Sequence, residues 1–161
     1  MSSSSELGLK PDPSFENDEK LFRRVDEQHI QNNRVMGNAL EEIREQHPSC
    51  SFNREKYSLP EQVLDPSRPE QNRIAYLVAG NLPKPELYPL DPSVPQAQKV
   101  LYAFRLIHLP EENNYSHTEA QVTKRGQDAT KVGSKSVRRE LREALAEKMT
   151  VLPKTASSGT A

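Results

Sequence analysis

Two histidines and a glutamate stand close together in the chain, at a spacing that suits a divalent metal ion. His108 and His117 flank a polar stretch, and Glu119 follows two residues after His117. Two imidazoles and a carboxylate bind Zn²⁺ or Mn²⁺ and leave a position open for water, whose pKa the metal lowers. Glu111 or Glu112 would then act as the general base. The pattern predicts a metal-dependent hydrolase or nuclease, with Zn or Mn as cofactor.

A structural role explains the same residues without any cofactor. His108 would make one hydrogen bond at the end of an apolar run, and His117 would be a half-exposed edge residue. Asn113 and Asn114 tolerate left-handed dihedral angles, which favours a turn over substrate binding. The sequence also lacks a tight helical ligand pair of the His-Glu-x-x-His kind. Both interpretations therefore stay open.

The elements that carry these residues are predicted to form a β-hairpin. Residues 101–109 are too few for a convincing core helix and are rich in aromatic and branched side chains, which favours a strand. Pro110 and the polar residues after it end this strand. Alternation resumes over residues 115–122, where His117 and Glu119 share one face. We expect a central strand followed by a polar strand that lies at an edge or lines a groove.

Shorter segments complete the predicted fold. Apolar spacing predicts a helix over residues 33–45, and Ser58 with Glu61 forms a capping box for a second short helix. A final helix begins at Ser134 or Ser136. Further strands are predicted at residues 20–25, 49–53 and 73–82. The fold class is therefore α+β: a small, mostly antiparallel sheet of four or five short strands with two short helices and a C-terminal helix.

Composition bounds the domain organisation and the compartment. The chain has 161 residues, of which 34% are hydrophobic and 13 are prolines, with a net charge of −1. Weakly apolar ends predict disordered tails at 1–19 and 151–161, around an α+β domain at 20–122 and a basic linker with the C-terminal helix at 123–150. Cys50 is the one cysteine, and neither a secretory signal nor a membrane span is evident. We expect a soluble cytoplasmic protein without a membrane partner.

The C-terminal region carries most of the positive charge. Residues 123–142 contain seven basic side chains against Asp128 and Glu140. Such an arm would bind phosphates without sequence preference, and the absence of interleaved aromatic residues argues against base stacking. The alternative is a solvated helix face. The candidate contact residues for nucleic acid or a partner are Lys124, Arg125, Lys131, Lys135, Arg138, Arg139 and Arg142.

The segment from His108 to His117, HLPEENNYSH, resembles a motif of a loosely defined group of small bacterial proteins of unknown function. In that group the motif reads His, any residue, Pro, a few residues, Asn, Pro, Ala, His; here Tyr115 and Ser116 replace Pro-Ala. The resemblance covers roughly residues 20–125 and implies no activity. Further matching segments are Leu21–Val25, Ser51–Arg54, Ser58–Glu61 and Ile74–Gly80.

These observations favour a small binding or accessory protein. It would contact a larger partner protein, or nucleic acid without sequence preference, through the basic arm and the C-terminal helix. The alternative is the metal-dependent hydrolase or nuclease centred on His108, His117 and Glu119.

Overall fold

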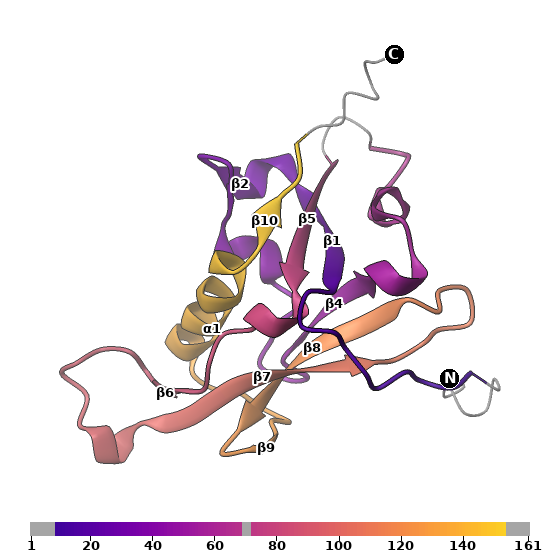
Figure 1. Ribbon diagram of the computed structural model, residues 1–161. Helices are drawn as coiled ribbons and strands as arrows, with labels where there is room; N and C mark the ends of the chain where they lie inside the picture. Colours follow the sequence, from indigo (N-terminus) through magenta and orange to yellow (C-terminus); the bar gives the residue numbers. More distant parts are fainter. Residues whose placement is uncertain (1–8, 69–71, 154–161) are drawn as a thin grey trace.

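The computed structural model describes residues 9–68 and 72–153, and an antiparallel sheet dominates it (Figure 1). In these residues the sheet has eight strands in the order β10-β5-β1-β4-β8-β7-β6, with β9 paired to β8. A separate hairpin joins β2 (Ile30–Gln31) to β3 (Arg34–Val35). The strands of the large sheet are β1 (Lys20–Asp26), β4 (Ser49–Arg54), β5 (Asn72–Val78), β6 (Glu86–Tyr88), β7 (Val100–His108), β8 (His117–Lys124), β9 (Gln127–Asp128) and β10 (Thr150–Val151).

The predicted fold class of four or five strands with two short helices and a C-terminal helix is wrong. Within the described residues α1 (Lys135–Glu147) is the one α-helix, and shorter helical turns are of the 3-10 type. The helix expected over residues 33–45 is absent because Asn32 and Asn33 adopt left-handed φ angles of 51° and 60°, which turn the chain into the β2–β3 hairpin. The 3-10 helices are η1 (Glu27–His29), η2 (Gly37–Leu40), η3 (Glu55–Tyr57), η4 (Pro60–Val63), η5 (Ala79–Asn81) and η6 (Gln96–Gln98).

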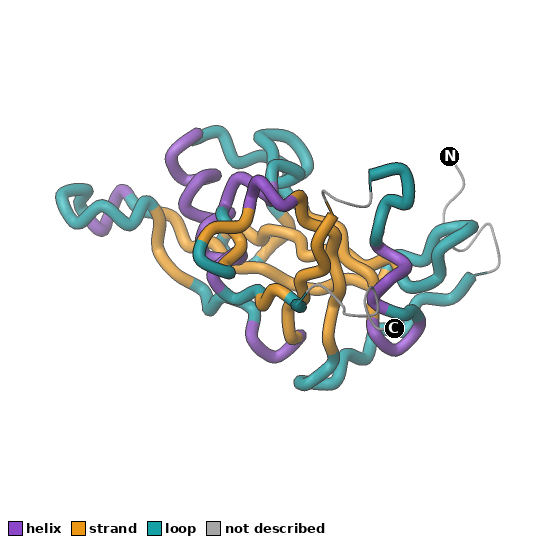
Figure 2. Tube along the Cα trace, turned by 90° about the horizontal axis from the view of Figure 1, so that it is seen from above, coloured by secondary structure: helices purple, strands orange, loops and turns teal. Residues whose placement is uncertain are grey.

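The hairpin of β7 and β8 forms where the alternation predicts it. Its register pairs Phe104 with Val122 and Leu106 with Ala120. Directly paired residues of an antiparallel ladder share a face, so these four side chains point into the core. The loop between β6 and β7 projects from the body in both views (Figures 1 and 2).

The helix α1 covers the apolar face of the sheet. Its side chains Val137, Leu141 and Leu145 are buried in the same core as the strands, and Ser134 caps it by accepting a hydrogen bond from the Val137 amide at 3.2 Å. η2 packs against α1 closely, since a Cβ atom at Gly37 would lie 2.8 Å from Glu143 Cγ. α1 therefore uses its apolar stripe within its own chain.

The opposite face of the sheet is polar where β4 meets β8. Ser51 lies opposite Glu119 and Asn53 opposite His117, and all four side chains are half-buried. η4 packs over the β1 and β5 end of the sheet. The predicted capping box of Ser58 and Glu61 is not formed, because η4 begins one residue later with Leu59 as its N-cap, and the Leu59 amide donates to the Gln62 side chain at 2.7 Å. η4 therefore covers the β1 and β5 end of this face, and the neighbouring part, where β4 meets β8, stays open.

Residues 9–19, which the sequence assigns to a disordered tail, lie against the hairpin tip and β4. The guanidinium of Arg54 donates to the backbone oxygens of Asp12 and Ser14 at 2.6 Å and to both carboxylate oxygens of Glu19 at 2.8 and 2.9 Å. Near the C-terminus, Val151, which the sequence assigns to the second disordered tail, pairs with Ala75 of β5. The remainder of both predicted tails, 1–8 and 154–161, lies outside the described residues. None of the helices in the described part is long and apolar enough to cross a membrane.

Candidate functional site: a polar cleft around His117

The predicted metal ligands do not converge. His108 lies opposite Thr118 in the β7–β8 ladder, so His108 projects to the face opposite to that of His117. His117 and Glu119 share a face, as the alternation predicts, but Glu119 Oε1 accepts a hydrogen bond from the side-chain nitrogen of Gln121 at 3.1 Å. Among residues 9–68 and 72–153, no three His, Cys, Asp or Glu side chains are grouped as metal ligands.

Both ring nitrogens of His108 are engaged by the backbone. Its Nδ1 accepts from the Asp12 amide at 2.8 Å, and its Nε2 donates to the Tyr115 carbonyl at 2.6 Å. Tyr57 stacks on the imidazole with ring centroids 5.5 Å apart. Burial lowers the pKa of His108, against the opposing effect of the Tyr115 carbonyl. His108 therefore fixes the N-terminal segment to the hairpin as a neutral imidazole.

The predicted general bases lie in the exposed turn of the hairpin. Glu111 Oε2 is 3.7 Å from His117 Nδ1, and the Glu111 side chain is 60% exposed. Glu112 is exposed as well. Glu111 therefore lies near His117, one of the predicted metal ligands, but its carboxylate is exposed to solvent.

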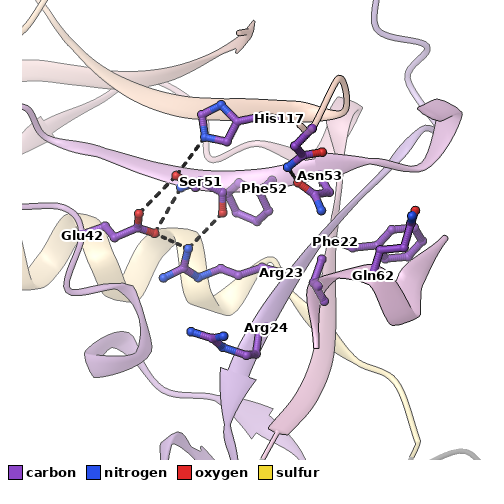
Figure 3. A pocket seen from close by; sticks show the side chains of 11 residues that line it. Phe22, Arg23, Arg24, Glu42, Ser51, Phe52, Asn53, Gln62 and His117 are labelled. Atoms are coloured by element: carbon purple, nitrogen blue, oxygen red, sulfur yellow. Dashed lines mark hydrogen bonds and ion pairs between the residues drawn. The ribbon is translucent and has the colours of Figure 1, made fainter. Parts of the chain in front are cut away.

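His117 opens into a cleft of about 480 Å³ on the uncovered face, which we call the His117 cleft (Figure 3). Apolar walls come from Phe22, Phe52 and Val63. The cleft is bounded by β1, by β4 with η4, and by β8 with the hairpin turn, three regions that are far apart in sequence. Its polar lining residues are Arg23, Arg24, Glu42, Ser51, Asn53, Gln62, Asn114 and His117.

A chain of hydrogen bonds runs along one wall of the His117 cleft (Figure 3). His117 Nδ1 donates to the Leu109 carbonyl at 2.9 Å, and Nε2 lies 3.3 Å from Ser51 Oγ. Ser51 Oγ donates to Glu42 Oε2 at 3.1 Å, and the Ser51 amide donates to Glu42 Oε1 at 3.2 Å. Glu42 in turn pairs with Arg23. The imidazole, the hydroxyl, the carboxylate and the guanidinium thus form one connected row.

The carboxylate in this row is held in its charged form. Although burial raises the pKa of Glu42, the charge and hydrogen bonds of Arg23 and the hydrogen bonds of Ser51 lower it overall. The neighbouring thiol of Cys50 behaves in the opposite way, because burial raises its pKa to about 12. A Cys50 thiolate is therefore no candidate for chemistry near neutral pH.

Arg23 and Arg24 extend in the same direction in the cleft but differ in their partners (Figure 3). Arg23 is 13% exposed and donates to Glu42 and to the carbonyls of Ser51 and Ala39. Its Nε is nevertheless buried without a hydrogen-bond partner in the described residues. The Arg24 side chain is 45% exposed, with Asp65 Oδ2 at 3.8 Å from its Nη1. Both arginines therefore have N–H donors without a protein partner close by in the described residues: the buried Nε of Arg23 and the half-exposed guanidinium of Arg24.

Several side chains of the predicted basic arm make hydrogen bonds or ion pairs with other parts of the chain. Arg142 donates to the Ile43 carbonyl at 2.8 and 3.1 Å, and Arg138 donates to the carbonyls of Val132 and Gly133 at 2.8 and 3.1 Å. Lys131 pairs with Glu45 at 3.5 Å. Lys124 is half-buried on β8, and the exposed members are Arg125, Lys131, Lys135 and Arg139. The arm is thus part of the folded body.

Sequence reasoning placed His117 at a site but missed Arg23, Arg24, Glu42 and Ser51. These residues come from β1, β4 and the segment after η2, and only the strand order brings them together. The available signal was the polar alternation of β4, which was predicted as a strand but not as a functional face.

A scan against protein-family models finds no match for this chain, and searches of curated proteins and of solved structures find none either.

Proposed function

We propose that this protein is a binding module whose ligand is a small polar molecule held in the His117 cleft. The observation that carries the proposal is the guanidinium of Arg24, which lines the cleft with a side chain that is 45% exposed and has Asp65 Oδ2 only at 3.8 Å. A guanidinium has five N–H donors in a fixed geometry, which suits a ligand with oxygen atoms.

The dimensions and the setting of the His117 cleft support a small ligand. Its volume of about 480 Å³ falls in the usual range for small-molecule sites, roughly 300–1,000 Å³. Most of its polar groups stand on the strands β1, β4 and β8, which hold side chains more firmly than loops do. The lining offers amides, a hydroxyl, an imidazole and a guanidinium, which suits a ligand with several oxygen atoms.

The cleft replaces the basic arm as the proposed contact surface. Binding remains the proposed class of function, as the sequence favours. Arg138 and Arg142 already donate to backbone carbonyls of the same chain, so they have fewer donors left for phosphates. The half-exposed Arg24 keeps its guanidinium accessible inside a concave site, where a ligand can be enclosed.

A titration followed by amide NMR tests this function. A library of small polar molecules is added to the full chain, and compounds that bind are expected to shift the amide signals of Ser51, Asn53 and His117. Arg24→Gln should weaken binding roughly tenfold, since hydrogen bonds to charged groups contribute about 1.5–3 kcal/mol. Arg139→Gln, an exposed arginine on α1, is the matched control and should leave affinity unchanged. Shifts confined to other surfaces, or no binder at all, would overturn the proposal.

A further inference from the structure

Carboxylates outnumber guanidiniums around the His117 cleft. Arg23 and Arg24 are the two arginines among its lining residues, and each has a carboxylate at ion-pair distance. Four acidic side chains lie in or beside the cleft: Glu42, Asp65, Glu111 and Glu119. An anion would therefore meet more negative than positive charge, and a cation would have to approach the guanidinium of Arg24. The ligand that this charge balance favours is uncharged.

The hydrogen-bond acceptors of the cleft wall are already used within the protein. Glu42 Oε2 accepts from the Ser51 hydroxyl, and Glu42 Oε1 accepts from the Ser51 amide and from Arg23. In the hairpin turn, Asn114 Oδ1 accepts from the Ser116 hydroxyl. A ligand that brings N–H or O–H groups would have to compete with these donors, so the lining favours a ligand that brings acceptors.

Two side-chain amides of the lining have their oxygens occupied and their NH2 groups available. Gln62 Oε1 accepts from the Leu59 amide at 2.7 Å, and because a backbone amide can only donate, the nitrogen is the end of Gln62 that remains. Asn53 Oδ1 accepts from Asn114 Nδ2 at 2.9 Å. In the described part of the chain, neither NH2 group has a hydrogen-bond partner. With the guanidinium of Arg24, they give the cleft three groups that can only donate (Figure 3).

From these contacts we infer that the ligand of the His117 cleft is an uncharged carbonyl compound, of the amide, lactam or ester kind, whose oxygen atoms accept hydrogen bonds from Arg24, Asn53 and Gln62. This inference rests on the proposed function. A carbonyl oxygen has two lone pairs and no proton, so it satisfies donors without needing an acceptor in return. A hydroxyl group also brings a proton, for which the wall has few acceptors left. The apolar walls of the cleft suit the hydrocarbon part of such a compound.

Three ring compounds of similar size separate the ligand classes. N-methylpyrrolidone is uncharged and has a carbonyl oxygen but no N–H or O–H, N-methylpyrrolidine is a cation at neutral pH, and cyclopentanecarboxylate is an anion. Each is titrated into the full chain and followed by amide NMR. We expect N-methylpyrrolidone to shift the side-chain NH2 signals of Asn53 and Gln62, and to bind roughly tenfold more tightly than either charged probe.

Gln62→Glu removes one donor and keeps the shape of the side chain. One carboxylate oxygen still accepts from the Leu59 amide, but the other replaces the NH2 group, so the affinity for N-methylpyrrolidone should fall roughly tenfold. Gln28→Glu adds the same charge at an exposed glutamine outside the cleft and should bind N-methylpyrrolidone like the parent.

Three results would overturn the inference and leave the proposed function standing. These are an unchanged affinity in Gln62→Glu, a charged probe that binds in the cleft at least as tightly as N-methylpyrrolidone, and no binding of N-methylpyrrolidone where members of the polar library do bind. If neither the probes nor the polar library binds in the cleft, the proposed function fails as well.

Discussion

Among the described residues, Arg54 has the largest of the fully buried side chains. It is fully buried, donates to Glu19 and to two backbone carbonyls, and stacks on Phe15 with 4.0 Å between Cζ and the ring centroid. Tyr57 lies over the same guanidinium at 5.3 Å. Because an isolated buried charge is costly, each partner of this pair depends on the other.

Removal of Arg54 alone should be strongly destabilising. Arg54→Ala leaves the Glu19 carboxylate buried without its partner, and we expect the free energy of unfolding to fall by about 3–5 kcal/mol. The double variant Arg54→Met with Glu19→Leu removes both charges and should regain a large part of that loss. Urea unfolding of the parent, the single and the double variant measures this. A single variant within about 1 kcal/mol of the parent would contradict the structural role.

His108 makes stability depend on pH in a defined direction. Its pKa is lowered by burial in the folded protein, so the unfolded chain binds a proton more readily. The neutral ring stabilises the fold fully above the unfolded value of about 6.5, and this contribution is lost as pH falls below it. Protonation also places an N–H against the Asp12 amide. His108→Gln should therefore reduce the slope of unfolding free energy against pH between about pH 5 and 7, and urea unfolding at several pH values measures this slope.

At the scale of elements, the hairpin and α1 follow from local patterns, and the segment before β4 does not. Alternation with Pro110 at its end specifies β7, and the stripe of Val137, Leu141 and Leu145 specifies α1. The apolar residues between 33 and 45 have helical spacing, but they fill the core from a hairpin and a 3-10 turn. Asn32 and Asn33 form a turn through their left-handed conformations, and the spacing of apolar residues alone cannot reveal such a turn.

The dependence of the fold on α1 can be measured at one buried position. Leu141 is 0% exposed at the centre of the stripe. Leu141→Ala should lower the free energy of unfolding by about 2–5 kcal/mol, through lost burial and the cavity left behind. Arg139→Ala changes an exposed residue of the same helix and should stay within about 0.5 kcal/mol of the parent. Thermal or urea unfolding distinguishes the two, and equal effects would mean that α1 does not pack as described.

At the scale of the whole molecule, strand order is what the sequence could not supply. Each strand predicts its own faces, but β1 lies between β5 and β4, and β4 meets β8 across a long separation in sequence. The His117 cleft depends on these long-range neighbours, so its arginines and Glu42 have no local signature. His117 was found because it is close in sequence to His108 and Glu119, which together suggested a metal site.

Hydrogen exchange should reproduce this arrangement. Amides in β1, β4 and β8, which have strands on both sides, should exchange only through global unfolding, with protection of about 5–15 kcal/mol. Amides of residues 91–98, in the projecting loop between β6 and β7, should show little protection. Mass-spectrometric or NMR exchange on the parent measures both. Comparable protection in the loop and in β4 would contradict the described topology.

The same strand order sets a sequence of events for the chain as it leaves the ribosome. β1, β4 and β5 emerge early, but β4 keeps an open edge until β8 has been made, and Cys50 and Phe52 have no hairpin to pack against before then. β5 waits longer, because β10 is added only after α1. Contacts so distant in sequence form slowly and leave apolar edges exposed meanwhile. The nascent chain therefore exposes unpaired strand edges, which favour aggregation, from the synthesis of β4 until β8 and then β10 have been made.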